Sequence, residues 1–255
     1  MNGLHDRDRL EGLAKGLRIL EVFDSRHTRV TVAEAARQVG LTRASARRCM
    51  LTLAALGYVE TDGKRYWLGH GALRLAYAYV SSTRLPRLIQ PVLEALCERN
   101  RDSASLAVLF DDAAVIAARA TARRTMRIGL VVGSRLPLYC SAAGRVLLAG
   151  LPEAQASALL MEQERRSLTA NTVTELSSLS ALLTECRHNG YALCNEEIEL
   201  GVRSIGVPLF DAGGTVLAAL TISTRTERMT AAEMVQAYLP MLKTHQEWVR
   251  TRLLV

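Results

Sequence analysis

The segment 31–69 constrains the fold more than any other part of this 255-residue chain. Thr31 is a favoured helix N-cap residue, and Glu34 three positions later completes a capping box, so a short helix is predicted to begin here. Thr42 is predicted to cap a second helix, which continues to about Leu56 with apolar residues at spacings of three and four. The segment therefore predicts two short helices joined by a tight turn.

A hairpin is predicted directly after these helices. Tyr58–Thr61 and Arg65–Leu68 alternate like short strands, and Asp62-Gly63 between them is a strong turn signal. This order is typical of a winged helix-turn-helix, in which the second helix enters the DNA major groove and the ribbon reaches the flanking backbone. The candidate DNA-binding residues are Thr42, Arg43, Ser45, Arg47, Arg48, Lys64 and Arg65. The alternative is a helical subdomain whose basic face is merely solvated.

The charge of the chain is unevenly distributed. The formal net charge is +7, and residues 1–80 hold thirteen Lys and Arg against eight Asp and Glu, so most of the excess lies in the first third. This asymmetry fits a nucleic-acid-binding front part and a near-neutral remainder.

The cysteines and the hydropathy pattern bear on the compartment. The five cysteines are widely spaced with no CxxC pair, which argues against a disulfide framework or a zinc site and favours reduced thiols. We find no signal-peptide pattern, no apolar run long enough to span a membrane, and no metal or cofactor motif. We therefore expect a cytoplasmic protein without membrane association, metal or cofactor.

Two further helices are expected beside the winged segment. Leu10–Phe23 is amphipathic and is predicted to complete a three-helix core. Gly71–Ser82 is unusually apolar and is predicted to be a linker helix, whose apolar stripe packs either on a second subunit or on its own domain. Dimerisation would let two reading helices contact two half-sites.

The rest of the chain mixes helices with antiparallel-type strands, which predicts an α+β sensor domain with one central sheet. The expected helices are Arg87–Asn100 (opened by Pro86), Ser141–Gly150, Pro152–Met161, Glu175–His188 and Thr230–Leu254, the last interrupted or kinked near Pro240. The expected strands are Ser105–Phe110, Ala113–Ala120, Met126–Val131, Tyr191–Asn195, Ile205–Phe210 and Thr215–Ser223, with a loop at Gly133–Pro137.

Two stretches are candidates for holding a small molecule. The stretch 139–144 combines a helix start with small side chains, and backbone N–H groups at such a start suit carboxylates. Polar groups of a second stretch and of a later strand are expected to converge on one pocket with it. The candidate effector-binding residues are Arg135, Tyr139, Ser141, Ala142, Ala143, Gly144, Asn195, Ser204, Thr221 and Ser223. The alternative for Ser141 is a simple N-cap, and for Arg135 an exposed loop arginine.

An enzyme is the alternative from a different class of function. A hydrolase would use Ser141 or Cys140 as its nucleophile, but the local sequence CSAAG is no nucleophile elbow. The sequence also lacks HExxH, a phosphate-binding loop and a dinucleotide fingerprint. We therefore expect no enzymatic activity.

Several of these motifs resemble the isocitrate-lyase-regulator (IclR) family of bacterial transcription factors. The similarity covers nearly the whole chain and is carried by LAKGLRILEVF, TVAEAARQVGLTRASARRCMLTLAALGYVE, YCSAAGRVLLA and NEEIELGVRSIGVPLFDAGGTVLAALTIS. Within the family, LTRASARRCMLTLAALGYVETDGKRYWL is similar to regulators of protocatechuate and 4-hydroxybenzoate breakdown, the β-ketoadipate pathway group.

The resemblance implies a two-domain protein: an N-terminal all-α winged helix-turn-helix at residues 1–70, a linker helix at 71–84 and an α+β, GAF-like effector domain at 85–255. It implies homodimers, often paired into homotetramers. The effector would lie between 141–144 and the positions matching Asn195, Ser204, Thr221 and Ser223. The family often has aspartate at Asn195 and cysteine at Ser204, so this chain departs from it at both.

The expected function is sequence-specific binding to double-stranded operator DNA, with an affinity that responds to a small organic acid in the second domain. This acid is expected to be aromatic. The effector can act only through unequal affinity for two arrangements of the dimer. Besides the hydrolase, a structural protein that binds DNA without a ligand is a further alternative.

Overall fold

The computed structural model describes residues 10–24, 26–121 and 129–253. The chain forms two compact units, Met1–Ser82 and Thr83–Val255. Within the described ranges, no helix combines the length and the apolar character needed to cross a lipid bilayer.

The first unit contains the predicted pair of helices. The capping box at the start of α2 (Val32–Gln38) is formed: the Glu34 carboxylate accepts from the Thr31 N–H at 2.7 Å, and the Thr31 hydroxyl accepts from the Glu34 N–H. Thr42 caps α3 (Arg43–Ala55) by accepting from the Ser45 N–H at 3.2 Å. These caps satisfy N–H groups that a helix start would otherwise leave unpaired.

A buried apolar cluster holds the first unit together. It joins α1 (Glu11–Leu20) to α2 and α3 and reaches the hairpin of β1 (Val59–Thr61) and β2 (Tyr66–Leu68). Helix α1 ends at Leu20 and is shorter than the predicted Leu10–Phe23. Since Val30 also bridges to Tyr66, the unit has a small sheet beside its helices, and the term all-α describes only its helical core.

The last element of the first unit is α4 (Gly71–Ser82), as the apolar pattern predicts. Its large apolar side chains Leu73, Leu75, Tyr77 and Tyr79 are exposed. The sequence left open whether α4 packs on its own domain or on a second subunit. Its own domain leaves most of the large apolar side chains of α4 exposed.

The second unit is built on a six-stranded antiparallel sheet in the order β5-β4-β3-β8-β7-β6. Its strands are β3 (Ser103–Phe110), β4 (Ala113–Ala120), β5 (Arg135–Pro137), β6 (Ala192–Asn195), β7 (Val202–Phe210) and β8 (Val216–Arg225). Its helices are α5 (Arg84–Asn100), α6 (Ala142–Ala149), α7 (Glu153–Glu162), α8 (Leu176–Asn189) and α9 (Ala231–Leu253).

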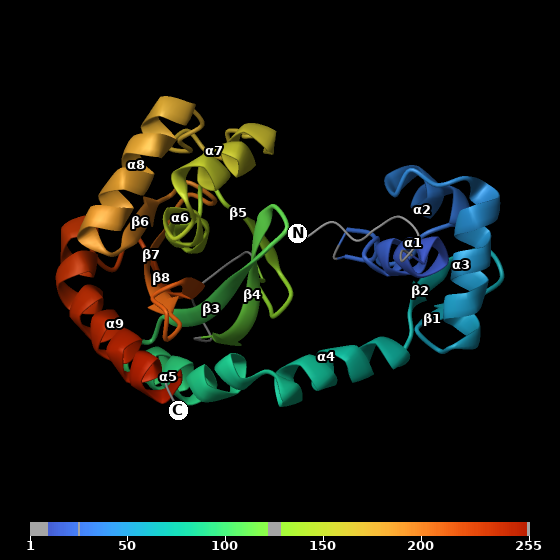
Figure 1. Cartoon of the computed structure of the whole chain (residues 1–255), viewed down its shortest axis with the longest axis horizontal. Helices are drawn as coiled ribbons and strands as arrows, with labels where there is room; N and C mark the ends of the chain where they lie inside the picture. Colours follow the sequence, from blue (N-terminus) through green and yellow to red (C-terminus); the bar gives the residue numbers. More distant parts are fainter. Residues whose placement is uncertain (1–9, 25, 122–128, 254–255) are drawn as a thin grey trace. The chain divides into compact units, whose positions relative to one another are not determined.

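Helices cover both faces of this sheet (Figure 1). Helices α5 and α9 share one apolar cluster with β3, β4, β7 and β8, and α6, α7 and α8 share a second cluster on the opposite face. Alternate residues of a strand point to opposite faces, and β3, β4 and β8 supply residues to both clusters.

The structure corrects three details of the expected elements. The stretch expected to be a loop at 133–137 contains strand β5, which pairs with β4. Helix α5 begins at Arg84, before Pro86, because proline is tolerated in a first turn. Helix α9 continues through Pro240, so the predicted interruption is wrong, and only the alternative of a kink is left. The expected strand Met126–Val131 lies largely outside the described residues.

Candidate nucleic-acid interface and ligand cavity

Helix α3 presents its basic residues on the surface of the first unit. Arg43, Arg47 and Arg48 are exposed, because the apolar positions Ala46 and Met50 face the core instead. The segment that carries the DNA-binding prediction is therefore accessible to a duplex.

Two of these arginines face the hairpin. Arg43 and Arg47, one helical turn apart, line an open cleft of about 590 Å³ together with Leu51, the start of α2, and Lys64 at the hairpin tip. Cations from α3 and from the hairpin thus converge on one concave surface, as contact with a phosphate backbone requires.

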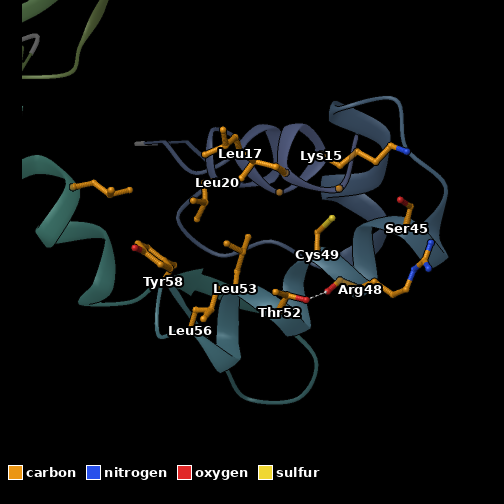
Figure 2. A pocket seen from close by; sticks show the side chains of 14 residues that line it. Lys15, Leu17, Leu20, Ser45, Arg48, Cys49, Thr52, Leu53, Leu56 and Tyr58 are labelled. Atoms are coloured by element: carbon orange, nitrogen blue, oxygen red, sulfur yellow. Dashed lines mark hydrogen bonds between the residues drawn. The ribbon is translucent and has the colours of Figure 1, made fainter. Parts of the chain in front are cut away.

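The other two candidates on α3 line a different surface. Ser45 and Arg48 lie at the edge of a groove of about 700 Å³ between α1, α3 and α4. Figure 2 shows Lys15, Ser45 and Arg48 at one end of this groove and the apolar side chains Leu53 and Leu56 at the other. The predicted DNA-binding residues of α3 therefore lie on two different surfaces, which the sequence did not indicate.

The hairpin tip is a hydrogen-bonded turn that carries two cations, Lys64 and Arg65. The Asp62 carboxylate accepts from the backbone N–H groups of Arg65 at 2.7 Å and Lys64 at 2.9 Å. These hydrogen bonds lower the pKa of Asp62. Arg29, which the sequence prediction missed, lies over the ring of Trp67 at 4.3 Å from its centroid and is a further exposed cation beside the hairpin.

A small cavity in the second unit collects several of the predicted effector-binding residues. Its volume is about 50 Å³, and the predicted residues in its lining are Ser141, Ala142, Ala143, Ser204, Thr221 and Ser223. The sheet register brings these hydroxyls together. Ser223 on β8 pairs with Ser204 on β7, and Thr221, two residues before Ser223, lies on the same face of the sheet. The start of α6 supplies the opposite part of the wall.

Four predicted residues lie elsewhere. The Asn195 side chain accepts from Arg203 Nε at 2.7 Å, on the face of the sheet opposite to Ser204. Arg135 pairs with Asp112 at 2.6 Å, and the Tyr139 hydroxyl donates to the Arg166 carbonyl. Among the described residues, these three lie outside the cavity lining.

The fourth is Gly144, which serves packing instead of ligand approach. A Cβ at this position would lie 2.4 Å from the Leu138 Cα and 2.5 Å from its carbonyl oxygen. The absence of a side chain lets the first turn of α6 lie directly against the preceding backbone.

The cavity wall also holds a buried ion pair that the sequence prediction missed. Arg145 on α6 donates to both carboxylate oxygens of Glu197, at 2.7 and 2.6 Å. Both residues are buried, and Glu197 lines the cavity. Nothing in the local sequence marks this pair, since its members are far apart in the chain.

Neither expected nucleophile of the hydrolase alternative is available for catalysis. The Ser141 hydroxyl donates to the Pro137 carbonyl at 2.6 Å and accepts from the Gly144 N–H, as a helix N-cap does. Burial raises the pKa of the Cys140 thiol to about 12, so this thiol is protonated at neutral pH. No group of three His, Cys, Asp or Glu residues suitable for a metal occurs in the described ranges.

Two family models match the chain. The IclR helix-turn-helix domain matches residues 12–63, and the bacterial transcriptional regulator IclR C-terminal domain matches residues 77–250. The second match alone covers more than half of the chain.

Known proteins of this family are similar over nearly the whole length. The Pca regulon regulatory protein of Pseudomonas putida is 38% identical over 93% of this chain and 82% of its own length. The p-hydroxybenzoate hydroxylase transcriptional activator of Acinetobacter baylyi is 34% identical over 94% and 90%. A solved IclR homologue from Microbacterium hydrocarbonoxydans, in complex with 4-hydroxybenzoate, is 26% identical with a TM-score of 0.76, over 95% of this chain and 99% of that one.

These relatives are regulators of transcription and not enzymes, in agreement with the engaged Ser141 hydroxyl and the protonated Cys140 thiol. The winged unit with its exposed basic helix and the separate cavity-bearing unit correspond to the two matched domains. The chain belongs to the IclR family of DNA-binding bacterial transcriptional regulators.

Proposed function

We propose that this regulator holds operator DNA between α3 and the hairpin, with Arg43, Arg47 and Lys64 as the principal cations. The observation that carries this proposal is their convergence on one open cleft from two elements. Arg65 and Arg29 are exposed beside the hairpin, and Arg48 is exposed at the edge of the groove between α1, α3 and α4. These three cations would extend the contact along the backbone. Thr42 and Ser45 would act mainly through the cap that fixes the first turn of α3.

Substitution of Arg47 tests this interface. Arg47→Ala is expected to weaken binding to the protein's own promoter fragment by about 10-fold or more and to reduce the salt slope by about one. Arg99→Ala, which removes the same charge from exposed α5, is the matched control and is expected to leave both unchanged. Equal behaviour of the two variants would contradict the assignment.

We further propose that the effector is an aromatic acid bound at the cavity beside Ser141. The relatives that act on protocatechuate and p-hydroxybenzoate genes, and the homologue with bound 4-hydroxybenzoate, support this class of ligand. The start of α6 and the hydroxyls of Ser204 and Ser223 are suitable hydrogen-bond donors for a carboxylate, and Thr221 lies beside them in the lining.

Binding of such an acid requires the cavity to widen. At about 50 Å³ the cavity is far below the volumes of roughly 300 Å³ or more that are usual for ligand sites. Its wall is therefore expected to move on binding, and this movement would couple the ligand to DNA affinity. The GAF-like description of this domain, supported by the central antiparallel sheet with helices on both faces, belongs to the same proposal.

Calorimetry with 4-hydroxybenzoate and protocatechuate tests the effector site. Ala143→Leu would fill the cavity and is expected to abolish binding, because Ala143 is buried in its wall. Ala154→Leu, at an exposed position of α7, is the control and should bind like the parent. No heat with either acid in the parent protein would remove the proposal.

We also propose that residues 71–84 are a linker between a DNA-binding region at 1–70 and an effector-binding region at 85–255. The chain would act as a homodimer that forms through the groove between α1, α3 and α4. Leu13, Leu17, Leu56 and Leu75 at this groove are 62, 49, 59 and 51% exposed, which is unusual for a monomer surface. A second copy would cover them and set two α3 helices for two half-sites. Analytical ultracentrifugation of Leu17→Lys tests this: a shift toward monomer is expected, and an unchanged mass would contradict it.

A further inference from the structure

The two carboxylates in the cavity wall differ in their hydrogen bonding. Glu197 is fully engaged, since each of its oxygens accepts from Arg145. Glu199 also lines the cavity, but its Oε2 atom is buried and has no hydrogen-bond donor among the described residues. A buried acceptor without a donor is costly, so such an atom calls for an explanation.

The backbone around Glu199 is held firmly. Before it, the Glu196 carbonyl accepts from the Thr169 hydroxyl at 2.6 Å, and the Glu197 carbonyl accepts from the Thr172 hydroxyl at 2.7 Å. After it, the Gly201 N–H donates to the Glu196 side chain at 2.7 Å. The loop between β6 and β7 therefore fixes Glu199 at the cavity.

Other polar groups of the cavity are hydrogen-bond donors, whereas Glu199 Oε2 is an acceptor. Ser204 and Ser223 carry hydroxyls that can donate, and α6 begins there with its N–H groups, whereas the Thr221 hydroxyl donates to the Ser105 carbonyl at 3.4 Å. These groups suit an acid. The Glu199 oxygen repels an acid and accepts only from a ligand group that bears a proton.

We propose that Glu199 selects effectors that carry a hydroxyl group in addition to their carboxylate. This proposal rests on the proposed aromatic-acid effector. A phenolic hydroxyl would donate to Glu199 Oε2 while the carboxylate lies among the serine and threonine hydroxyls. An acid without a hydroxyl would leave the Glu199 oxygen unpaired beside a second negative charge, so it is rejected.

The test compares benzoate, 3-hydroxybenzoate and 4-hydroxybenzoate by calorimetry on the full-length protein. The parent is expected to bind its preferred hydroxybenzoate on the order of 100-fold more tightly than benzoate. In Glu199→Ala this ratio should fall below about 10-fold, with benzoate binding more tightly than it does to the parent, because a charge has been removed. Glu199→Gln retains an acceptor and should keep part of the preference.

The controls separate the possible failures. Glu185→Gln, which removes a charge from an exposed position of α8, should behave like the parent. Circular dichroism and thermal unfolding show whether each variant is folded, and the Gln variant provides the answer if the Ala variant is not. A parent ratio that both Glu199 variants preserve would overturn this inference alone. Failure of the parent to bind any of the three acids would overturn the proposed effector class and this inference with it.

Discussion

Arg145 and Glu197 form a buried ion pair that joins the first turn of α6 to the loop between β6 and β7. The pair is bidentate, with nitrogen–oxygen distances of 2.7 and 2.6 Å, and Arg145 Nε also donates to the Tyr139 carbonyl at 2.9 Å. The Val173 N–H donates to the same carboxylate at 3.2 Å. The pair therefore links α6 to this loop, and both contribute residues to the cavity lining.

Removal of one member of this pair is expected to destabilise the protein strongly. Arg145→Met leaves the Glu197 carboxylate buried without its cation, and the free energy of unfolding in urea should fall by about 3–5 kcal/mol. The double variant Arg145→Met, Glu197→Leu should recover part of this loss. The exposed pair of Arg166 and Glu164 provides the control, and Arg166→Met should change stability little. Equal losses at the buried and exposed arginines would contradict the role of the pair.

Gly144→Ala tests the close approach of α6 to the backbone before it. The added Cβ would lie 2.4 Å from Leu138 Cα, a backbone atom that cannot move alone, so α6 must shift and stability should fall by about 1–3 kcal/mol. Gly16→Ala is the control, since a Cβ there meets nothing within 4 Å and should slightly stabilise α1. Thermal unfolding compares the two, and a neutral Gly144→Ala would refute the packing role.

Asp62 has two opposing effects on DNA binding that can be separated. Its carboxylate holds the turn that presents Lys64 and Arg65, yet its charge repels phosphate. Asp62→Asn keeps an acceptor for the turn and removes the charge, so promoter affinity should be equal or higher. Asp62→Ala removes both and should lower affinity several-fold. Fluorescence anisotropy measures both, and an Asn variant weaker than the Ala variant would exclude this account of the turn.

The second unit is expected to lose stability at alkaline pH. Burial raises the pKa of the Cys140 thiol from 9.0 to about 12, so the native state retains a proton that the unfolded state has lost. The contribution of this thiol to the free energy of unfolding is fully present below pH 9 and is lost as the pH rises toward 12. The free energy of unfolding falls there by up to about 1.4 kcal/mol per pH unit. Urea unfolding at pH 8 and 10.5 should show a smaller loss for Cys140→Ala than for the parent. An identical loss in both proteins would count against this pKa.

The parts of the fold set by neighbouring residues were predictable from the sequence. The capping box of Thr31 and Glu34 and the turn at Asp62 depend on groups within a few positions of each other, and both are formed. The apolar spacing along α3 likewise identified Ala46, Met50 and Leu53 as buried and so left the arginines on the surface. Leu56, at the end of the same pattern, is exposed instead.

The parts set by distant residues were not. Strand β5 has three residues and depends on its pairing with β4, in which Leu136 lies opposite Ala114. The local sequence, with a glycine before it and a proline at its end, suggested only a loop. Asn195 was expected beside Ser204, but the register pairs it with Arg203 and turns it to the other face. The Arg145–Glu197 pair likewise depends on the packing of α6 against the sheet, which no local pattern contains.

The account depends most on coupling between the acid site and the operator. Anisotropy titrations of labelled promoter DNA, with and without 4-hydroxybenzoate and at several salt concentrations, measure it directly. We predict sequence-specific binding with a steep negative salt slope and a change of at least about 5-fold in affinity when the acid is present. Equal affinity for a scrambled fragment, or an operator affinity that no concentration of the acid alters, would contradict the account.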